Sequence, residues 1–193
     1  MNRKLLLIPI WTAYLFVSFV FIKMHLADVY FRKSQDLLKN ESTEKALGFA
    51  NKAVSLNPLE PNYFRGRAKI NVVRLGSFGG TSLKESVLND LKTAYNLNPQ
   101  NLVTIRNSIP LYYFLTMKYM ILGPVKENFD EKYLQPAINY LEQAKKSYWT
   151  DAGVITEVAG YEKKLGLDAD YKESVERIRK IRPDLLDWND SFR

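Results

Sequence analysis

The feature that most constrains this chain is a spacing of small residues that ends in a proline. In the stretch ALGFANKAVSLNP, residues 46–58, Ala46, Ala50 and Ala53 follow one another at steps of four and three before Pro58. Such steps bring side chains onto one face of an α-helix, and small side chains there let a second helix approach closely. Proline cannot continue a helix, so the stretch predicts a packed helix that stops before Pro58.

The same frame recurs three times further along the chain. The matching stretches are SVLNDLKTAYNLNP (86–99), QPAINYLEQAKKSYW (135–149) and DYKESVERIRKIRP (170–183). Each of the four is preceded by a segment with helical periodicity, at residues 27–38, 61–75, 102–120 and 152–166. A helix–turn–helix unit that recurs with a period of roughly 34 residues predicts an all-α fold, an α-solenoid of about four helical hairpins.

These units resemble tetratricopeptide (TPR) repeats. We expect repeats over residues 27–60, 61–101, 102–151 and 152–185, with a C-terminal cap over residues 186–193. Two units depart from the pattern, because GSFGGTS lengthens the turn of the second and ILGPVKENFDEKY separates the helices of the third. Pro110 inside the first helix of the third unit predicts a kink or a late helix start.

The N-terminal region carries an uncharged, mostly apolar run of eighteen residues, LLLIPIWTAYLFVSFVFI, at residues 5–22. A helix of that length spans most of a hydrocarbon core of ~30 Å, so we expect a single-pass transmembrane anchor over residues 1–24 and a repeat domain over 25–193. A cleaved secretory signal and a buried helix are the alternatives, but the run is long and bulky for a signal. Arg3 and Lys4 favour a cytoplasmic N-terminus, which places the repeat domain outside the cytoplasm.

Composition argues against several classes of chemistry. The chain has no cysteine and one histidine, and it contains neither GxSxG nor HExxH, so we expect no catalytic residue, no metal and no cofactor. Although its net charge is +7, the sequence lacks the dense basic runs with interleaved aromatics that mark nucleic-acid binders. We therefore expect a protein that binds partners, none of them nucleic acid.

The repeat frame also singles out candidate binding residues, because the first helix of each repeat lines the concave side of such a solenoid. The expected partner-binding groove contains Phe31, Gln35, Arg65, Lys69, Arg106 and Asn107. Its cations suit an acidic peptide, a C-terminal carboxylate or an anionic glycan, and a solvated basic face is the alternative. Gly66 stands where a carboxylate clamp would require asparagine. We expect the aromatic set Tyr112, Tyr113, Phe114 and Tyr119 to form core between repeats.

A second resemblance concerns cellular context. An apolar anchor leading into ADVYFRKSQDLL, followed by NPLEPNYFRGRAKI and NPQN, is similar to the membrane-anchored C-terminal repeat domain of O-antigen ligase/polymerase-like proteins of candidate-phylum bacteria. No position here corresponds to that family's multi-spanning catalytic part. The resemblance implies a scaffold or adaptor for a protein partner at the bacterial cell envelope, in surface polysaccharide assembly. The alternative is a regulatory or glycan-binding component of a ligase/polymerase-like system.

Overall fold

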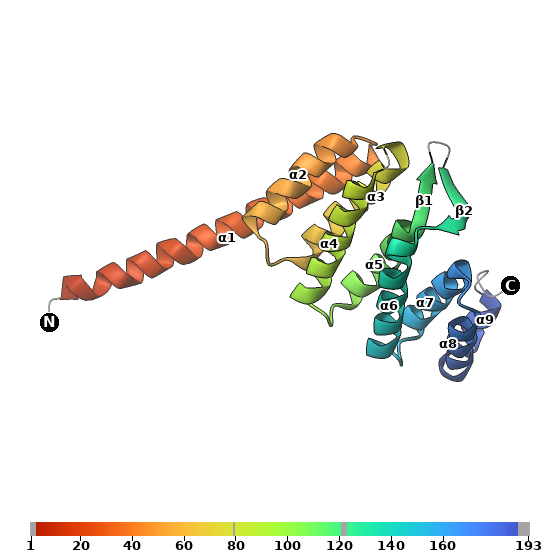
Figure 1. The fold of residues 1–193 in the computed structure, drawn as a ribbon. Coiled ribbons are helices and arrows are strands. Elements are labelled where there is room, and N and C mark those ends of the chain that lie inside the picture. Colours follow the sequence, from red (N-terminus) through yellow and green to blue (C-terminus); the bar gives the residue numbers. More distant parts are fainter. Residues whose placement is uncertain (1–2, 79, 121–122, 189–193) are drawn as a thin grey trace.

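The computed structural model describes residues 3–78, 80–120 and 123–188. Its helices are α1 (Arg3–Lys39), α2 (Thr43–Leu56), α3 (Pro61–Phe78), α4 (Thr81–Leu97), α5 (Leu102–Thr116), α6 (Glu131–Ser147), α7 (Ala152–Leu165), α8 (Asp168–Ile181) and α9 (Asp184–Trp188). Two strands, β1 (Met117–Met120) and β2 (Gly123–Phe129), lie between α5 and α6. Figure 1 shows the helices packed side by side in pairs, with the N-terminal part of α1 extending alone from the rest.

The helices form two layers. The C-terminal half of α1 pairs with α2, and the following pairs are α3 with α4, α5 with α6, and α7 with α8. In one layer α1, α3, α5 and α7 contact each other in turn, whereas α2, α4 and α6 each pack on the first helix of the next pair. This arrangement is an α-solenoid, as the recurring frame predicts.

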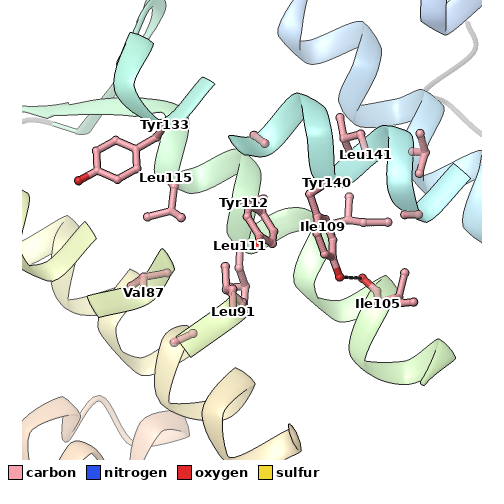
Figure 2. Close-up of a cluster of buried hydrophobic side chains, with 14 of the residues drawn as sticks. Val87, Leu91, Ile105, Ile109, Leu111, Tyr112, Leu115, Tyr133, Tyr140 and Leu141 are labelled. Carbon is pink, nitrogen blue, oxygen red and sulfur yellow. Dashed lines mark hydrogen bonds between the residues drawn. The ribbon is translucent and has the colours of Figure 1, made fainter. Parts of the chain in front are cut away.

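The residues of the recurring frame form the interior. Ala46, Ala50 and Ala53 are completely buried, and so are their counterparts Val87 and Ala94. The largest buried cluster extends from α3 to α7. At its centre, Val87 and Leu91 of α4 face the aliphatic side chains of α5 (Figure 2). Tyr140 of α6 stacks on Tyr112 with ring centroids 4.1 Å apart, and its hydroxyl donates to the Ile105 carbonyl oxygen at 3.3 Å. These contacts hold α5 at the centre of the molecule.

The inserted segment of the third repeat contains a β-hairpin. The expectation that a helix continues to Met120 is wrong, because α5 ends at Thr116 and Met117 begins an antiparallel strand. Gly123 and Pro124 begin the second strand, and neither residue favours helix continuation. The Asp130 amide donates to the Thr116 carbonyl oxygen at 2.6 Å and closes the base of the hairpin.

Pro110 lies inside α5 and does not delay its start. The helix begins at Leu102, and the Asn101 side chain caps it by accepting a hydrogen bond from the Thr104 amide at 2.9 Å. Because proline has no N–H, the carbonyl oxygen of Arg106 has no donor four residues further along the helix. Pro110 thus removes one backbone hydrogen bond from the middle of α5.

Helix α1 continues without a break from the apolar run into the first helical hairpin. Its residues from Trp11 to Ile22 are exposed apart from half-buried Ser18, and Ala27 is the first buried residue described. Trp11–Lys39 contains a stretch long and apolar enough to cross a membrane. No part of the described chain covers this apolar rod.

Candidate functional site on the concave face

The exposed side of α3, α5 and α7 forms one continuous surface, which we call the concave face. It lies opposite the second helices, which cover the other side of this layer. Helical steps of three and four residues place its members on one stripe of each helix. The exposed residues of this face are Lys69 and Val73 of α3, Val103, Arg106, Asn107 and Phe114 of α5, and Lys164 of α7.

The contact between α1 and α3 closes the N-terminal end of the concave face. Phe31 is half-buried, with its ring centroid 4.9 Å from that of Tyr63, and it lies directly against Gly66. Gln35 is also half-buried beside Gly66, and the Tyr63 hydroxyl donates to Asp28. Phe31 and Gln35 therefore help to join two hairpins and offer little free surface to a ligand.

Gly66 is explained by the same contact. A Cβ atom at this position would lie 2.3 Å from Cε2 of Phe31 and 2.7 Å from its Cζ, far inside van der Waals contact. Only glycine lets the ring of Phe31 pack this closely, so an asparagine of the kind found in carboxylate clamps cannot occupy position 66. Any binding mode on this face must differ from such a clamp.

The middle of the face carries a cation with an unused donor. Arg65 is half-buried and donates from Nη2 to the Asn62 side-chain oxygen at 3.2 Å. Its Nε is buried and has no hydrogen-bond partner among the described residues. Burial lowers the pKa of the Arg65 guanidinium, with Glu60 opposing this effect. A buried donor without an acceptor is unfavourable, and this one is enclosed by the protein rather than open to a ligand. Lys69, one turn further along α3, is exposed.

The C-terminal end of the face is hollowed between α5, α7 and α9. The hollow measures about 360 Å³, within the range of roughly 300–1,000 Å³ typical of ligand clefts. It is lined by Arg106, Gly153, Thr156, Glu157, Gly160, Tyr161, Lys164 and Leu185. The two glycines of α7 and the short side chain of Thr156 leave this space open.

Charges in this hollow are arranged around its rim. Arg106 Nε lies 3.6 Å from Glu157 Oε2 in a loose ion pair, and Lys164 Nζ lies 4.4 Å from the ring centroid of Tyr161. Thr156 Oγ1 is buried and has no hydrogen-bond partner among the described residues. The hollow thus presents two cations, one of them loosely paired with Glu157, and an aromatic ring, which together suit an oxygen-bearing anion attached to an apolar group.

Sequence reasoning missed the apolar part of the face. Val73, Val103 and Phe114 are 45%, 56% and 37% exposed. Phe114 was expected in the core with Tyr112, but residues two apart on a helix point in directions about 200° apart, and Phe114 is exposed whereas Tyr112 is buried. Helical spacing could have found the two valines. Val73 lies four residues after Lys69 and Val103 three residues before Arg106, so each shares a helix face with a predicted groove residue.

In the described part of the chain, no group of three or more histidine, cysteine, aspartate and glutamate side chains is placed to hold an ion. Another hollow, of about 370 Å³, lies between α4 and α6. There Gln143 Nε2 already donates to the Tyr95 hydroxyl at 2.7 Å. The concave face combines exposed cations with exposed apolar side chains, and we take it as the candidate site.

Comparison with solved structures shows the fold. TTC0263, a thermophilic TPR protein of Thermus thermophilus, is 18% identical, and the match covers 81% of this chain and 75% of that one with a TM-score of 0.54. YrrB, a TPR protein with an unusual peptide-binding site, is 18% identical over 80% of this chain and 68% of its own, with a TM-score of 0.47. No protein-family model and no curated protein matches the sequence. The likeness to TTC0263 establishes a TPR-like solenoid, and the O-antigen ligase-like resemblance stays a prediction.

Proposed function

We propose that this chain is a membrane-anchored TPR-like scaffold that binds a protein partner through a short segment with acidic and apolar residues. The observation that carries the proposal is the mixture on the concave face, where Lys69, Arg106 and Lys164 are interspersed with Val73, Val103 and Phe114. Exposed apolar side chains that gather on one surface and are flanked by polar groups are typical of interaction sites.

Each kind of group on the concave face has a role in this mode of binding. Arg106 and Lys164 would pair with carboxylates, because a guanidinium and an ammonium both donate charge-assisted hydrogen bonds. Arg65, half-buried on α3 with its Nη2 donating to the Asn62 side-chain oxygen, would add positive charge near the peptide. An anionic glycan could use the same cations but would gain little from Val103 and Phe114, so we favour a peptide.

The anchor is the second half of the proposal. Residues 11–22 of α1 are exposed apart from half-buried Ser18, and the helix joins the repeat domain without a linker. We infer that this part spans a bilayer, with the repeat domain outside the cytoplasm at the bacterial cell envelope. The role in surface polysaccharide assembly rests on the resemblance in sequence alone.

Peptide selection tests the binding face. The full-length protein in nanodiscs would be used to select from a displayed library of random peptides, and we expect acidic peptides with one or more large apolar residues. The variant Arg106→Glu/Lys164→Glu should lose these peptides. The control Lys92→Glu/Lys146→Glu makes the same charge change at exposed positions of the second helices α4 and α6 and should retain them. Equal binding by both variants would exclude the concave face.

Protease treatment of intact cells tests the orientation. A repeat domain outside the cytoplasm is digested once the cell surface or periplasm is opened to the protease. If the domain is digested only after the cytoplasmic membrane is broken, the proposed orientation is reversed.

A further inference from the structure

The turn between α2 and α3 lies against α1 at the end of the apolar run. Residues 57–60 of this turn and Val20, Lys23 and Met24 of α1 line one hollow of about 380 Å³, together with Leu56. In Figure 1 this turn passes beside α1 where the free rod enters the helical pairs. The repeat domain therefore reaches back along α1 to the level of Val20.

That level is the boundary of the proposed membrane span. The apolar run ends at Ile22, two residues after Val20. At 1.5 Å per residue, Val20 lies only about 3 Å inside the end of the run. A group beside Val20 in the turn thus lies where the acyl chains of a bilayer give way to the headgroups.

The turn presents an apolar side chain at this depth. Leu59 is 75% exposed, the largest exposure of any large hydrophobic side chain among those described. It has no protein partner that would cover it in water, and it continues the exposed apolar surface of α1 on a different segment of the chain. Lys23, in the same hollow, has a long apolar stem and can extend its ammonium to lipid phosphates.

The backbone of the turn is suited to a poorly hydrated place. The Leu59 amide donates to Asn57 Oδ1 at 3.3 Å, and the Asn62 amide donates to Glu60 Oε1 at 3.1 Å. Pro58 has no N–H to satisfy. Because these donors are paired or missing, the turn can leave bulk water at a lower cost than an ordinary loop.

We propose that the α2–α3 turn is a second membrane contact, in which Leu59 enters the boundary between headgroups and acyl chains of the bilayer that α1 spans. This inference rests on the proposed anchoring of α1. Two contacts, one helix and one turn, would fix the tilt of the first hairpin and hence the direction in which the concave face opens relative to the membrane.

The absence of cysteine from the sequence makes a direct test possible. Three single substitutions, Leu59→Cys, Phe16→Cys and Val103→Cys, would be labelled with the environment-sensitive fluorophore NBD in full-length protein. The protein would be placed in phosphatidylcholine/phosphatidylglycerol nanodiscs, with and without lipids spin-labelled near the carbonyl end of the acyl chain. All three positions are exposed, so the labels should leave the core intact.

We expect blue-shifted emission and quenching by the spin-labelled lipid for the Leu59→Cys and Phe16→Cys labels. The Val103→Cys label, on the concave face, should show neither. If the Phe16→Cys label is quenched while the Leu59→Cys label behaves like the Val103→Cys label, the anchor stands and the second contact is excluded. If the Phe16→Cys label is not quenched, the anchoring itself is contradicted, and this inference with it.

Discussion

At the scale of single residues, Gly66 sets how closely the first two hairpins approach. The ring of Phe31 occupies the space where any side chain at position 66 would begin. Gln35 Nε2 would lie 3.1 Å from the same Cβ. The closeness of α1 to α3 thus depends on the absence of one side chain.

The substitution Gly66→Ala should lower the free energy of unfolding by about 1–3 kcal/mol, because it overpacks a tight helix contact. Gly48→Ala is the matched control, since an added Cβ there meets nothing within 4 Å. At this helix-interior position alanine should stabilise by roughly 0.5–1 kcal/mol. Urea unfolding monitored by circular dichroism measures both, and a stabilising Gly66→Ala would contradict the packing described.

Another single residue, Glu162 of α7, is a carboxylate held in the interior. Its exposed fraction is 2%, and Lys145 Nζ lies 3.1 Å from its Oε1. Burial raises the pKa of Glu162 above its ordinary value, although the ammonium of Lys145 opposes the rise. Lys145 also lies 2.8 Å from Glu173 Oε2 and so links α6 to both α7 and α8.

This raised pKa predicts a pH dependence of stability. The folded chain holds the Glu162 proton more tightly than the unfolded chain, so this group's contribution to stability becomes less favourable as the pH rises from the ordinary pKa of 4.5 through the raised one. The stability of Glu162→Gln relative to wild type should therefore increase between about pH 4 and pH 7. Urea unfolding at several pH values measures this difference. Glu176→Gln, at an exposed carboxylate of α8, is the control, and an equal trend for both variants would contradict the assignment to Glu162.

At the scale of elements, Lys84 links the inserted β-hairpin to the solenoid through hydrogen bonds. Lys84 of α4 is buried, and its Nζ donates to the Met117 carbonyl oxygen at 2.7 Å and to Asp130 Oδ2 at 2.8 Å. Met117 begins β1, and Asp130 directly follows β2. Because a two-stranded hairpin alone is marginally stable in water, its attachment at both ends matters.

The substitution Lys84→Met should lower the free energy of unfolding by about 1–3 kcal/mol, since it leaves a carbonyl and a half-buried carboxylate without their donor. The rate of amide hydrogen exchange in residues 117–129 should increase in the same variant. Lys132→Met is the matched control, because Lys132 pairs with Glu85 on the exposed surface, and this variant should change neither quantity measurably. Hydrogen-exchange mass spectrometry provides the comparison, and unchanged exchange at the hairpin of Lys84→Met would contradict the attachment.

At the scale of the whole molecule, the buried core is unevenly distributed. The central cluster draws on α3, α4, α5, α6 and α7, whereas the C-terminal cluster consists of Ile155, Ala159 and Ile178 with three partly buried neighbours. In α8 only Ser174 and Ile178 are buried. A solenoid whose units contact only their neighbours can lose an end without losing its centre.

Native-state hydrogen exchange should therefore be slowest in α5 and α6 and fastest, among the second helices, in α8. The matched substitutions Ile109→Ala and Ile178→Ala remove the same side-chain atoms from completely buried positions. Ile109→Ala should lower the free energy of exchange throughout the solenoid by about 2–4 kcal/mol, because it opens a cavity in the central cluster. The second should lower protection only in α7 to α9. Equal protection of all helices in wild type would exclude this gradient.

Much of the architecture could be predicted because helical periodicity is a local property. The spacing of Ala46, Ala50 and Ala53 predicts their burial, and all three are buried. The third repeat was less predictable, since the strand after Thr116 depends on pairing with a second strand, from Met117 with Phe129 to Met120 with Gly123. For the candidate site, the frame places Arg106 on the inner layer, but it could not show that Phe31 packs against Gly66.

The sequence by itself determined the helices, their order and the residues that pack between them, because each helix is specified by residues within a few turns of one another. Only the tertiary structure decided which distant residues meet. It placed Arg106 beside Glu157 and Lys84 beside Asp130, and it brought Leu59 to the level of Val20. These contacts depend on the angles at which the helices cross and on the lengths of the turns. The spacing of residues within a single helix does not specify either of them.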